Sequence, residues 1–227
     1  MKLCHAAGQV VIPVGGNTGL VEGATAGEDD ILLSLERMSA IESLDETACT
    51  MTVQAGVPLH TVQERAADAD LMFPVDFGAR GSAQIGGAIS TNAGGNAVIR
   101  YGMMREQVLG LEAVLADGTV VSSMNRLLTN NAGYDLKQLF IGTEGTLGVV
   151  TRVVFRLRPA PASRTTALLA CPDYVAAKGM RVFAVPLAGD PFIVSGESGA
   201  VTLGALTFIA EDPAYADLKE YLGMGPD

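Results

Sequence analysis

Short stretches of apolar residues predict three strands in the first part of the chain, and the third of them alternates between apolar and polar positions. Their apolar residues are β-branched or aliphatic, and turn-forming residues stand at their ends, as is typical of strands buried on at least one face. The predicted strands are Val10–Pro13, Asp30–Leu35 and Cys49–Gln54. A helix is predicted after them, because apolar residues recur at helical spacing from Pro58 to about Asp70.

Three further elements are predicted in the second half of the chain. An Asp-Gly pair at Asp117 stands between apolar β-formers and indicates a hairpin over Leu109–Ser122. Tyr134–Phe140 is predicted to be a short helix whose two leucines and final phenylalanine form its apolar side. A long strand over Leu147–Leu157 ends at the prolines that follow it. This mixture of helices, strands and hairpins favours the α+β class.

Glycine-rich sequence interrupts this pattern at three places, called here the first (Ile12–Leu20), second (Gly81–Gly95) and third (Ile141–Gly148) glycine segments. Glycine costs backbone entropy and adds no packing, so its repeated use beside strands indicates backbone N–H groups close to a ligand. Adjacent N–H groups in such turns bind anions, which makes phosphate the first candidate. Each segment alone is equally well explained as a tight loop, whereas the three together favour a large cofactor that carries phosphate.

The sequence excludes two common nucleotide-binding motifs. A Rossmann fingerprint needs G-x-G-x-x-G at the start of a helix, but Leu20–Glu28 contains too many glycines to begin one. A Walker P-loop needs Gly-Lys followed by Ser or Thr, and the chain has no such sequence. The first glycine segment is therefore expected to be a cradle of amides rather than the N-terminus of a helix.

Composition narrows the class of protein further. Of the 227 residues, 48% are hydrophobic and 18% are charged, as in ordinary globular proteins. The net charge of −10 argues against a nucleic-acid partner, so local amide dipoles must hold an anionic cofactor. The three cysteines are too few and too scattered for a disulfide framework or a zinc site, and no metal is expected. No signal peptide or transmembrane segment is predicted, and a cytoplasmic location is expected.

Four motifs carry a family resemblance: Pro13–Val21, Gly86–Gly95, Arg100–Gly102 and Tyr134–Val150. Together they resemble the FAD-binding domain, of the PCMH type, of the vanillyl-alcohol-oxidase family. Within that family the sequence is most similar to the D-2-hydroxy-acid dehydrogenases, which act on D-2-hydroxyglutarate, D-lactate or glycolate. The resemblance covers residues 8 to 170 and implies an α+β fold of two α/β subdomains with FAD as cofactor.

The resemblance implies a role for each glycine segment in FAD binding. The first would surround the pyrophosphate, with Gly16 too close to it for a Cβ, and the second would lie along the flavin and ribityl chain. The third would lie near the adenosine end. The implied cofactor-binding residues are Gly15, Gly16, Asn17, Thr18, Gly19, Leu20, Pro74, Gly81, Ser82, Gly86, Gly87, Thr91, Asn92, Gly94, Gly95, Glu144, Gly145 and Val150. For Pro74, Gly81 and Glu144, shaping a loop without touching the ligand is the alternative.

FAD is expected to bind without a covalent link. His5 precedes the first predicted strand and His60 lies in the predicted helix, so neither is placed at a flavin rim. Relatives with a histidyl link on the first glycine segment have it near the position of Asn17, which cannot form one. No catalytic residue is assigned, because the groups that would grip the substrate belong to a part of the family pattern that this chain does not match.

Both ends of the chain depart from the family pattern. Relatives carry one more β-α unit before Val10 and a substrate-binding cap after Pro161, so the FAD-binding domain, placed at residues 1–174, is expected to be N-terminally truncated and incomplete for catalysis. Residues 175–227 are instead similar to an internal segment of diaminopropionate ammonia-lyases, which use pyridoxal phosphate. This segment is expected to be unrelated to the FAD-binding domain.

Three functions remain open on the sequence alone. The first is an oxidoreductase domain whose flavin N5 takes hydride from C2 of a 2-hydroxy acid. The second is a flavin-binding remnant without turnover, and the third is a fragment of a pyridoxal-phosphate lyase. The expected partners of the first are a small 2-hydroxy acid, once a cap domain is supplied, and an electron acceptor that the sequence does not identify.

Overall fold

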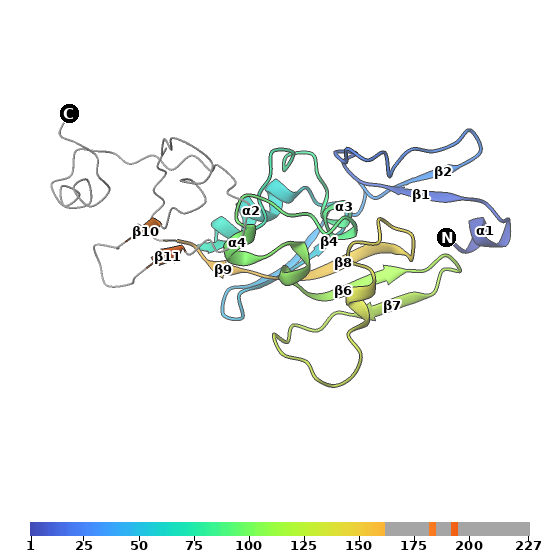
Figure 1. Cartoon of the computed structure of the whole chain (residues 1–227). Coiled ribbons are helices and arrows are strands. Elements are labelled where there is room, and N and C mark those ends of the chain that lie inside the picture. The colour runs from blue at the N-terminus through green and yellow to red at the C-terminus, as the bar shows by residue number, and fades with distance from the viewer. Residues whose placement is uncertain (162–181, 185–191, 195–227) are drawn as a thin grey trace, which may run out of the picture. The chain divides into compact units, whose positions relative to one another are not determined.

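A computed structural model of the chain describes residues 1–161, 182–184 and 192–194 (Figure 1). The chain divides into two compact units, Met1–Pro161 and Ala162–Asp227. In the second unit the described residues are two short strands that pair antiparallel, β10 (Val182–Ala184) and β11 (Phe192–Val194). The predicted boundary at residue 174 lies outside the described residues and stays a prediction, as does the origin of residues 175–227.

An antiparallel sheet of five strands forms the centre of the first unit (Figure 1). Its order is β3-β4-β8-β6-β7, so the strand that comes last in the sequence occupies the middle. β8 pairs with β4 on one side and with β6 on the other. The strands are β3 (Ile41–Asp45), β4 (Thr50–Gln54), β6 (Val108–Val114), β7 (Val120–Ser123) and β8 (Val149–Arg156).

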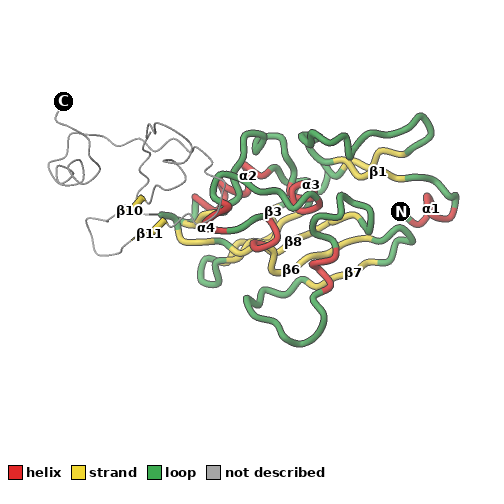
Figure 2. The backbone as a smooth tube through the Cα atoms, in the orientation of Figure 1, coloured by secondary structure: helices red, strands yellow, loops and turns green. Residues whose placement is uncertain are grey.

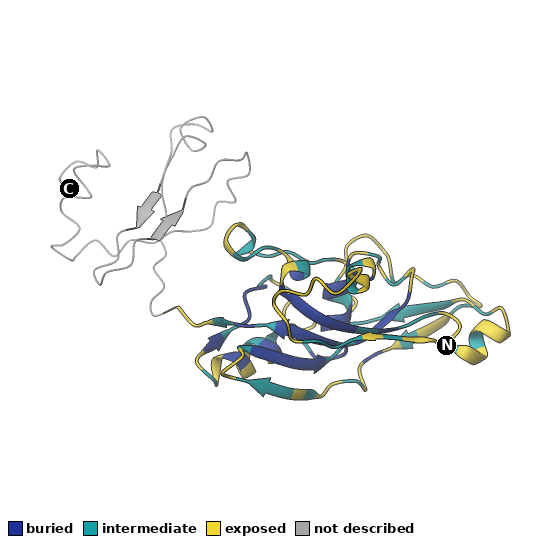
Figure 3. Ribbon diagram, turned by 90° about the horizontal axis from the view of Figure 1, so that it is seen from below, coloured by how far each residue is buried: buried dark blue, intermediate teal, exposed yellow. Residues whose placement is uncertain are grey.

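Helices cover one face of this sheet and close the hydrophobic core (Figures 1 and 2). α2 (Leu59–Ala67) begins after Pro58, as predicted, and buries its apolar side. α3 (Ile85–Ser90) buries Ile85 and Ile89 completely. The rings of Phe73 and Phe155 lie 4.5 Å apart between their centroids in the same core. Figure 3 shows the buried residues gathered in the central strands and the elements packed on them.

A separate parallel pair of strands carries the first glycine segment. β1 (Val11–Val14) pairs with β2 (Ile31–Ser34), and α1 (Lys2–Ala6) precedes β1. Residues 15–30, which connect the two strands, contain no helix. The prediction that the first glycine segment leads into a loop rather than a helix is therefore confirmed.

The hairpin predicted at Asp117 is confirmed, whereas the helix predicted at Tyr134–Phe140 is only partly so. Thr119 donates a backbone hydrogen bond to the side chain of Asp117 at 2.8 Å, and this bond lowers the pKa of that carboxyl. Within Tyr134–Phe140 the helix is only a single 3₁₀ turn, η2 (Leu136–Leu139), and its two leucines are more than half exposed. Only Phe140 is buried there, because this segment runs along the surface and contributes one side chain to the core.

Several elements of the first unit were not predicted. Two of them are β3, which contains a bulge at Glu42, and α3, which has two glycines directly after Ile85. The predicted strands correspond to β1, β2, β4 and β8, and the α+β class is confirmed. The remaining elements are β5 (Leu71–Met72), which pairs with β9 (Arg158–Pro159), α4 (Val98–Tyr101) and η1 (Met104–Gln107).

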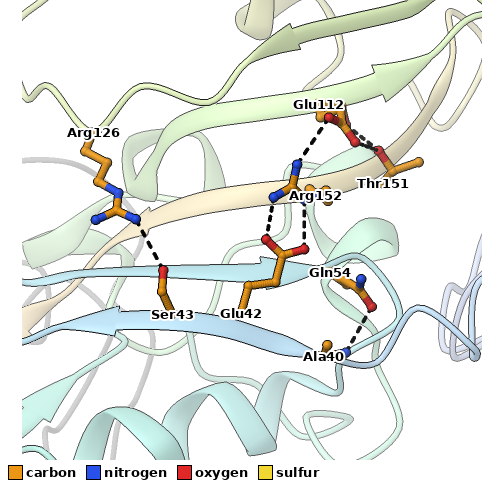
Figure 4. A network of polar contacts seen from close by, with 8 residues as sticks. All are labelled: Ala40, Glu42, Ser43, Gln54, Glu112, Arg126, Thr151 and Arg152. Carbon is orange, nitrogen blue, oxygen red and sulfur yellow. Dashed lines mark hydrogen bonds and ion pairs between the residues drawn. The ribbon is translucent and has the colours of Figure 1, made fainter.

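A network of charged side chains spans strands β3, β8 and β6 (Figure 4). The guanidinium of Arg152 binds both oxygens of Glu42, with Nε–Oε1 at 2.8 Å and Nη2–Oε2 at 2.5 Å, and its Nη1 lies 3.4 Å from Glu112. Thr151, the extra residue at a β6–β8 bulge, donates to the Glu112 carboxylate at 2.9 Å. The hydrogen bond from Arg152 lowers the pKa of Glu42, and Glu42 in turn raises the pKa of Arg152.

Replacing Glu42 by Gln should lower stability near neutral pH by up to about 1 kcal/mol, the upper range for an ion pair open to solvent. The folded-state pKa of Glu42 is depressed, so its stabilisation is present above the unfolded-state pKa and is lost as the pH falls through the folded-state value. Urea unfolding at several pH values should therefore show a difference between wild type and Glu42→Gln that shrinks below about pH 4. Glu46→Gln, in the neighbouring turn, is the matched control. A difference that persists unchanged at pH 3 would contradict the assignment.

Candidate functional site

The fold brings the first and second glycine segments into backbone contact. A Cβ placed on Gly16 would lie 1.8 Å from the carbonyl oxygen of Ser82. A Cβ on Gly15 would lie 3.5 Å from Oε1 of Gln84 and 3.8 Å from the amide nitrogen of Gly87. The loop that leaves β1 therefore lies directly against the start of α3.

The third glycine segment joins the other two through its backbone. The amide of Gly142 donates to the carbonyl of Ile89 at 3.2 Å, and that of Glu144 donates to Ser90 at 2.8 Å. A Cβ on Gly145 would lie 3.2 Å from the ring of Pro13, in β1. Three stretches that are far apart in the sequence thus surround one place beside α3.

The glycines in this assembly serve two different purposes. Gly16, Gly86 and Gly95 have no room for a side chain, because a Cβ on each would meet Ser82, Ala55 or Asp76 within 3 Å. Because these glycines lack a side chain, the protein segments on either side can pack in direct contact. The expectation that a bound ligand leaves no room for a Cβ on Gly16 is therefore wrong, since the carbonyl of Ser82 occupies that place. By contrast, a Cβ on Gly19, Gly81 or Gly87 would meet no atom within 4 Å. These three glycines border open space.

The first glycine segment also contains unused hydrogen-bond donors. Within the part of the chain that the structure describes, none of the backbone N–H groups of Gly16–Leu20 donates a hydrogen bond to protein. Successive free amides of this kind form a concavity that attracts an anion. The residues present therefore fit a phosphate-bearing group, as the sequence predicted.

Each glycine segment also holds one non-glycine residue in the left-handed region. Asn17 has φ 49°, Asn92 has φ 47° and Glu144 has φ 55°. Asparagine tolerates this region, whereas glutamate rarely adopts it, and such conformations concentrate where a backbone is shaped for a purpose. The carboxylate of Glu144 lies beside the loop between β1 and β2, because a Cβ on Gly23 would be 3.2 Å from its Oε2.

The structure brings several of the predicted residues together at α3, and some of their side chains already make hydrogen bonds or packing contacts within the protein. Thr91 donates to the carbonyl of Gly87 at 3.0 Å, and Oδ1 of Asn92 accepts from the backbone of Arg105 at 3.0 Å. Gly94 packs against Val98 rather than facing open space. The predicted positions that lie in α3, directly beside it or in contact with these residues are Gly15, Gly16, Ser82, Gly86, Gly87, Thr91, Asn92 and Glu144.

Two of the predicted residues lie in the protein interior. Val150 is 2% exposed within β8 and belongs to the hydrophobic core. Pro74 is buried between Phe73 and Val75, which are core residues too. Contact of either side chain with a cofactor stays a prediction.

Sequence reasoning missed Gln84 and Arg105. Gln84 is 8% exposed, and its Oε1 has no hydrogen-bond partner among the described residues although it lies beside Gly15. Arg105 reaches from η1 to Gln138, 33 residues away in the sequence. A polar residue inside an apolar glycine segment was a usable signal for Gln84, whereas nothing local marks Arg105.

A small cavity of about 150 Å³ lies beside the third glycine segment. It is lined by α1, by Val11 and Pro13 of β1 and by residues 145–149. The described residues contain no group of three or more His, Cys, Asp or Glu side chains that could hold a metal ion. No helix in the described part is both long enough and apolar enough to cross a membrane.

Gly16→Ala should lower the stability of the ligand-free protein by about 1–3 kcal/mol, because the new methyl group forces the first segment away from Ser82. Gly87→Ala is the matched control: it places a methyl group in open space within α3, where alanine favours the helix by about 1 kcal/mol. Urea unfolding followed by circular dichroism measures both. Equal stability of Gly16→Ala and wild type would show that the two segments do not touch.

Comparison with known proteins agrees with this geometry. The chain is 45% identical over 174 residues to the mitochondrial D-2-hydroxyglutarate dehydrogenase of Bos taurus and covers 32% of that protein. It is likewise 45% identical over 174 residues to D-2-hydroxyglutarate dehydrogenase of Xanthomonas citri pv. viticola, with 37% covered. A putative mitochondrial D-lactate dehydrogenase of Schizosaccharomyces pombe is 42% identical over 174 residues, with 33% covered. In each case 77% of this chain is matched, so it spans about a third of the length of these relatives.

Solved structures share the fold. Alkyldihydroxyacetonephosphate synthase superimposes with a TM-score of 0.63 at 22% sequence identity, covering 71% of this chain and 29% of the synthase. The first and second glycine segments, with the strands and helices that position them, lie within residues 1–123, which match the family described as FAD binding domain. The chain belongs to the FAD binding domain family.

Proposed function

We propose that this chain supplies the FAD-binding part of a D-2-hydroxy-acid dehydrogenase and binds FAD without a covalent link. FAD is the cofactor of the family to which the chain belongs. The observation that carries the proposal is the run of free amides at Gly16–Leu20, in a loop that contacts the second glycine segment at Gly16 and borders open space at Gly19. Relatives named as D-2-hydroxyglutarate and D-lactate dehydrogenases, 42–45% identical, support the substrate class.

Each part of the site has a proposed role toward FAD. The amides of Gly16–Leu20 donate to the pyrophosphate, and the open glycines Gly81 and Gly87 let the backbone approach the flavin and its ribityl chain. The cavity beside Gly145 takes the adenosine end. Bound FAD supplies a ring that accepts hydride from C2 of the substrate, while the protein holds and orients that ring.

We further propose that the FAD-binding domain has the two-subdomain PCMH architecture and extends to residue 174, and that residues 175–227 are similar to a segment of an ammonia-lyase. We also propose a cytoplasmic location, which the bacterial relative, named without an organelle, is compatible with.

The pyrophosphate assignment predicts a charge-specific effect at Gly19. A side chain there enters open space, so Gly19→Asp and Gly19→Asn should fold equally well. The aspartate should weaken FAD binding at least tenfold through repulsion of the phosphates, and asparagine should weaken it much less. Titration of FAD fluorescence measures the Kd, and the gap should narrow at high salt.

The same titration tests the cofactor itself. Wild type should bind FAD at least tenfold more tightly than FMN, which lacks the pyrophosphate linkage and the adenosine. Acid precipitation should release the flavin into the supernatant. A protein that binds no flavin, or a pellet that stays yellow, would overturn the cofactor proposal or its non-covalent form respectively.

Oxidation of 2-hydroxy acids by this chain alone is expected to be slow. The matches leave about two thirds of each relative uncovered, and the described residues offer no assigned group to hold a 2-hydroxy acid against the flavin. The FAD-loaded protein should therefore show little reduction of a dye acceptor with D-2-hydroxyglutarate, D-lactate or glycolate. Rapid, D-selective turnover would show that this chain alone builds a complete active site. Flavin binding with no turnover, even after the parts of a relative that this chain does not match are supplied in trans, would favour a non-catalytic flavin-binding protein.

A further inference from the structure

Arg105 links two glycine segments, through its side chain to the third and through its backbone N–H to the second. It lies in η1, and its guanidinium reaches the turn that leads into the third glycine segment. Nη1 donates to the carbonyl and to the side-chain oxygen of Gln138 at 2.9 and 2.7 Å, and Nη2 donates to the carbonyl of Ile141. Its backbone N–H donates to Oδ1 of Asn92 at 3.0 Å.

These contacts connect η1 and the third glycine segment to the C-terminal end of α3. Asn92 follows α3 in the second segment, and the third segment is attached to the same place by the amides of Gly142 and Glu144. A Cβ on Gly142 would lie 3.5 Å from both Arg105 Nη2 and the Cβ of Asn92. Arg105 therefore fixes the turn at Gly142 relative to Asn92, and with it the left-handed pair Asn92 and Glu144.

The charge of Arg105 is not neutralised by a neighbouring carboxylate. Arg80, Arg126 and Arg152 each lie within 4.0 Å of an aspartate or glutamate, whereas among the described residues no carboxylate oxygen lies that close to Arg105. Its donors go to uncharged oxygens instead. In a chain of net charge −10, a part-buried positive charge thus remains beside the glycine segments.

An unpaired, part-buried cation suits the chemistry of the proposed ligand. FAD carries two negative charges on its pyrophosphate, and the attraction between charges grows where water is partly excluded. The planar guanidinium also offers several donors in a fixed fork, which an ammonium group does not. The same side chain can therefore hold the protein segments and favour an anionic ligand.

We propose that Arg105 is a positioning residue of the FAD site. It holds the second and third glycine segments in fixed positions relative to each other, and its positive charge increases the affinity for the anionic cofactor. The proposal rests on the proposed function, since it assumes that FAD occupies the place between these segments. It assigns to Arg105 no part in hydride transfer.

Two variants separate the fork from the charge. Arg105→Lys keeps the charge but loses the fork, and Arg105→Met keeps the approximate length but loses both. Arg126→Gln is the matched control, because it removes one positive charge from a surface arginine that contacts Ser43 and Asp45 of β3. FAD affinity is measured by fluorescence titration at several salt concentrations, and the stability of each ligand-free variant by urea unfolding.

Arg105→Met should weaken FAD binding at least tenfold and should make the Kd less dependent on salt than in wild type. Arg105→Lys should keep the wild-type salt dependence with an intermediate Kd, and Arg126→Gln should match wild type in both. A purely structural role would lower affinity without changing the salt dependence, so unchanged salt dependence in Arg105→Met overturns the charge assignment.

The outcomes also separate this proposal from the proposed function. If wild type and Arg126→Gln bind no FAD, the proposed function fails and Arg105 has no such role. If wild type binds FAD and Arg105→Met binds it equally well, only the role of Arg105 is overturned. If Arg105→Met does not fold, Arg105→Lys is decisive. Wild-type FAD affinity in that variant would overturn the positioning role of the guanidinium, whereas reduced affinity with wild-type salt dependence would support it.

Discussion

The arrangement of this protein depends on backbone segments that touch without side chains between them. Gly16 lies against the carbonyl of Ser82 at a separation that no Cβ can occupy, and Gly95 meets the backbone of Asp76 in the same way. Glycine is the only residue that permits such approach. Because these contacts fix the loop after β1 against the start of α3, they decide where the free amides of Gly16–Leu20 lie. A site made of backbone donors requires this, since its geometry is only as definite as the path of the chain.

The core supplies the rigidity that these loops lack on their own. α3 packs its apolar face onto the sheet, and its last turn accepts hydrogen bonds from Gly142 and Glu144 of the third segment. Arg105 and Asn92 reinforce the same end of the helix. The glycine segments are thus loops in conformation but are anchored to buried structure, and preorganised donors bind a ligand without losing much freedom at the moment of binding.

Sequence reasoning succeeded where local chemistry decides the structure. Asp117 and its glycine specify a tight turn, and Pro58 marks the start of a helix, because both act through neighbouring backbone atoms. It failed at α3, where two glycines make helix formation intrinsically poor and burial of Ile85 and Ile89 outweighs that propensity. The glycine segments were recognisable as a site, but the division between glycines that face space and glycines that face protein was not. The role of Arg105 could not be predicted either, because its partners become its neighbours only when strands far apart in the sequence pair.

The position of β8 in the sheet has a consequence for biosynthesis. β4 and β6 are both held by β8, yet about a hundred residues separate Gln54 from Arg156, which at typical rates of translation is about 5–20 s of chain growth. Until β8 leaves the ribosome, β4 can pair only with β3, and β6 only with β7. The two halves of the sheet therefore join in one late step, when β8 pairs with both β4 and β6.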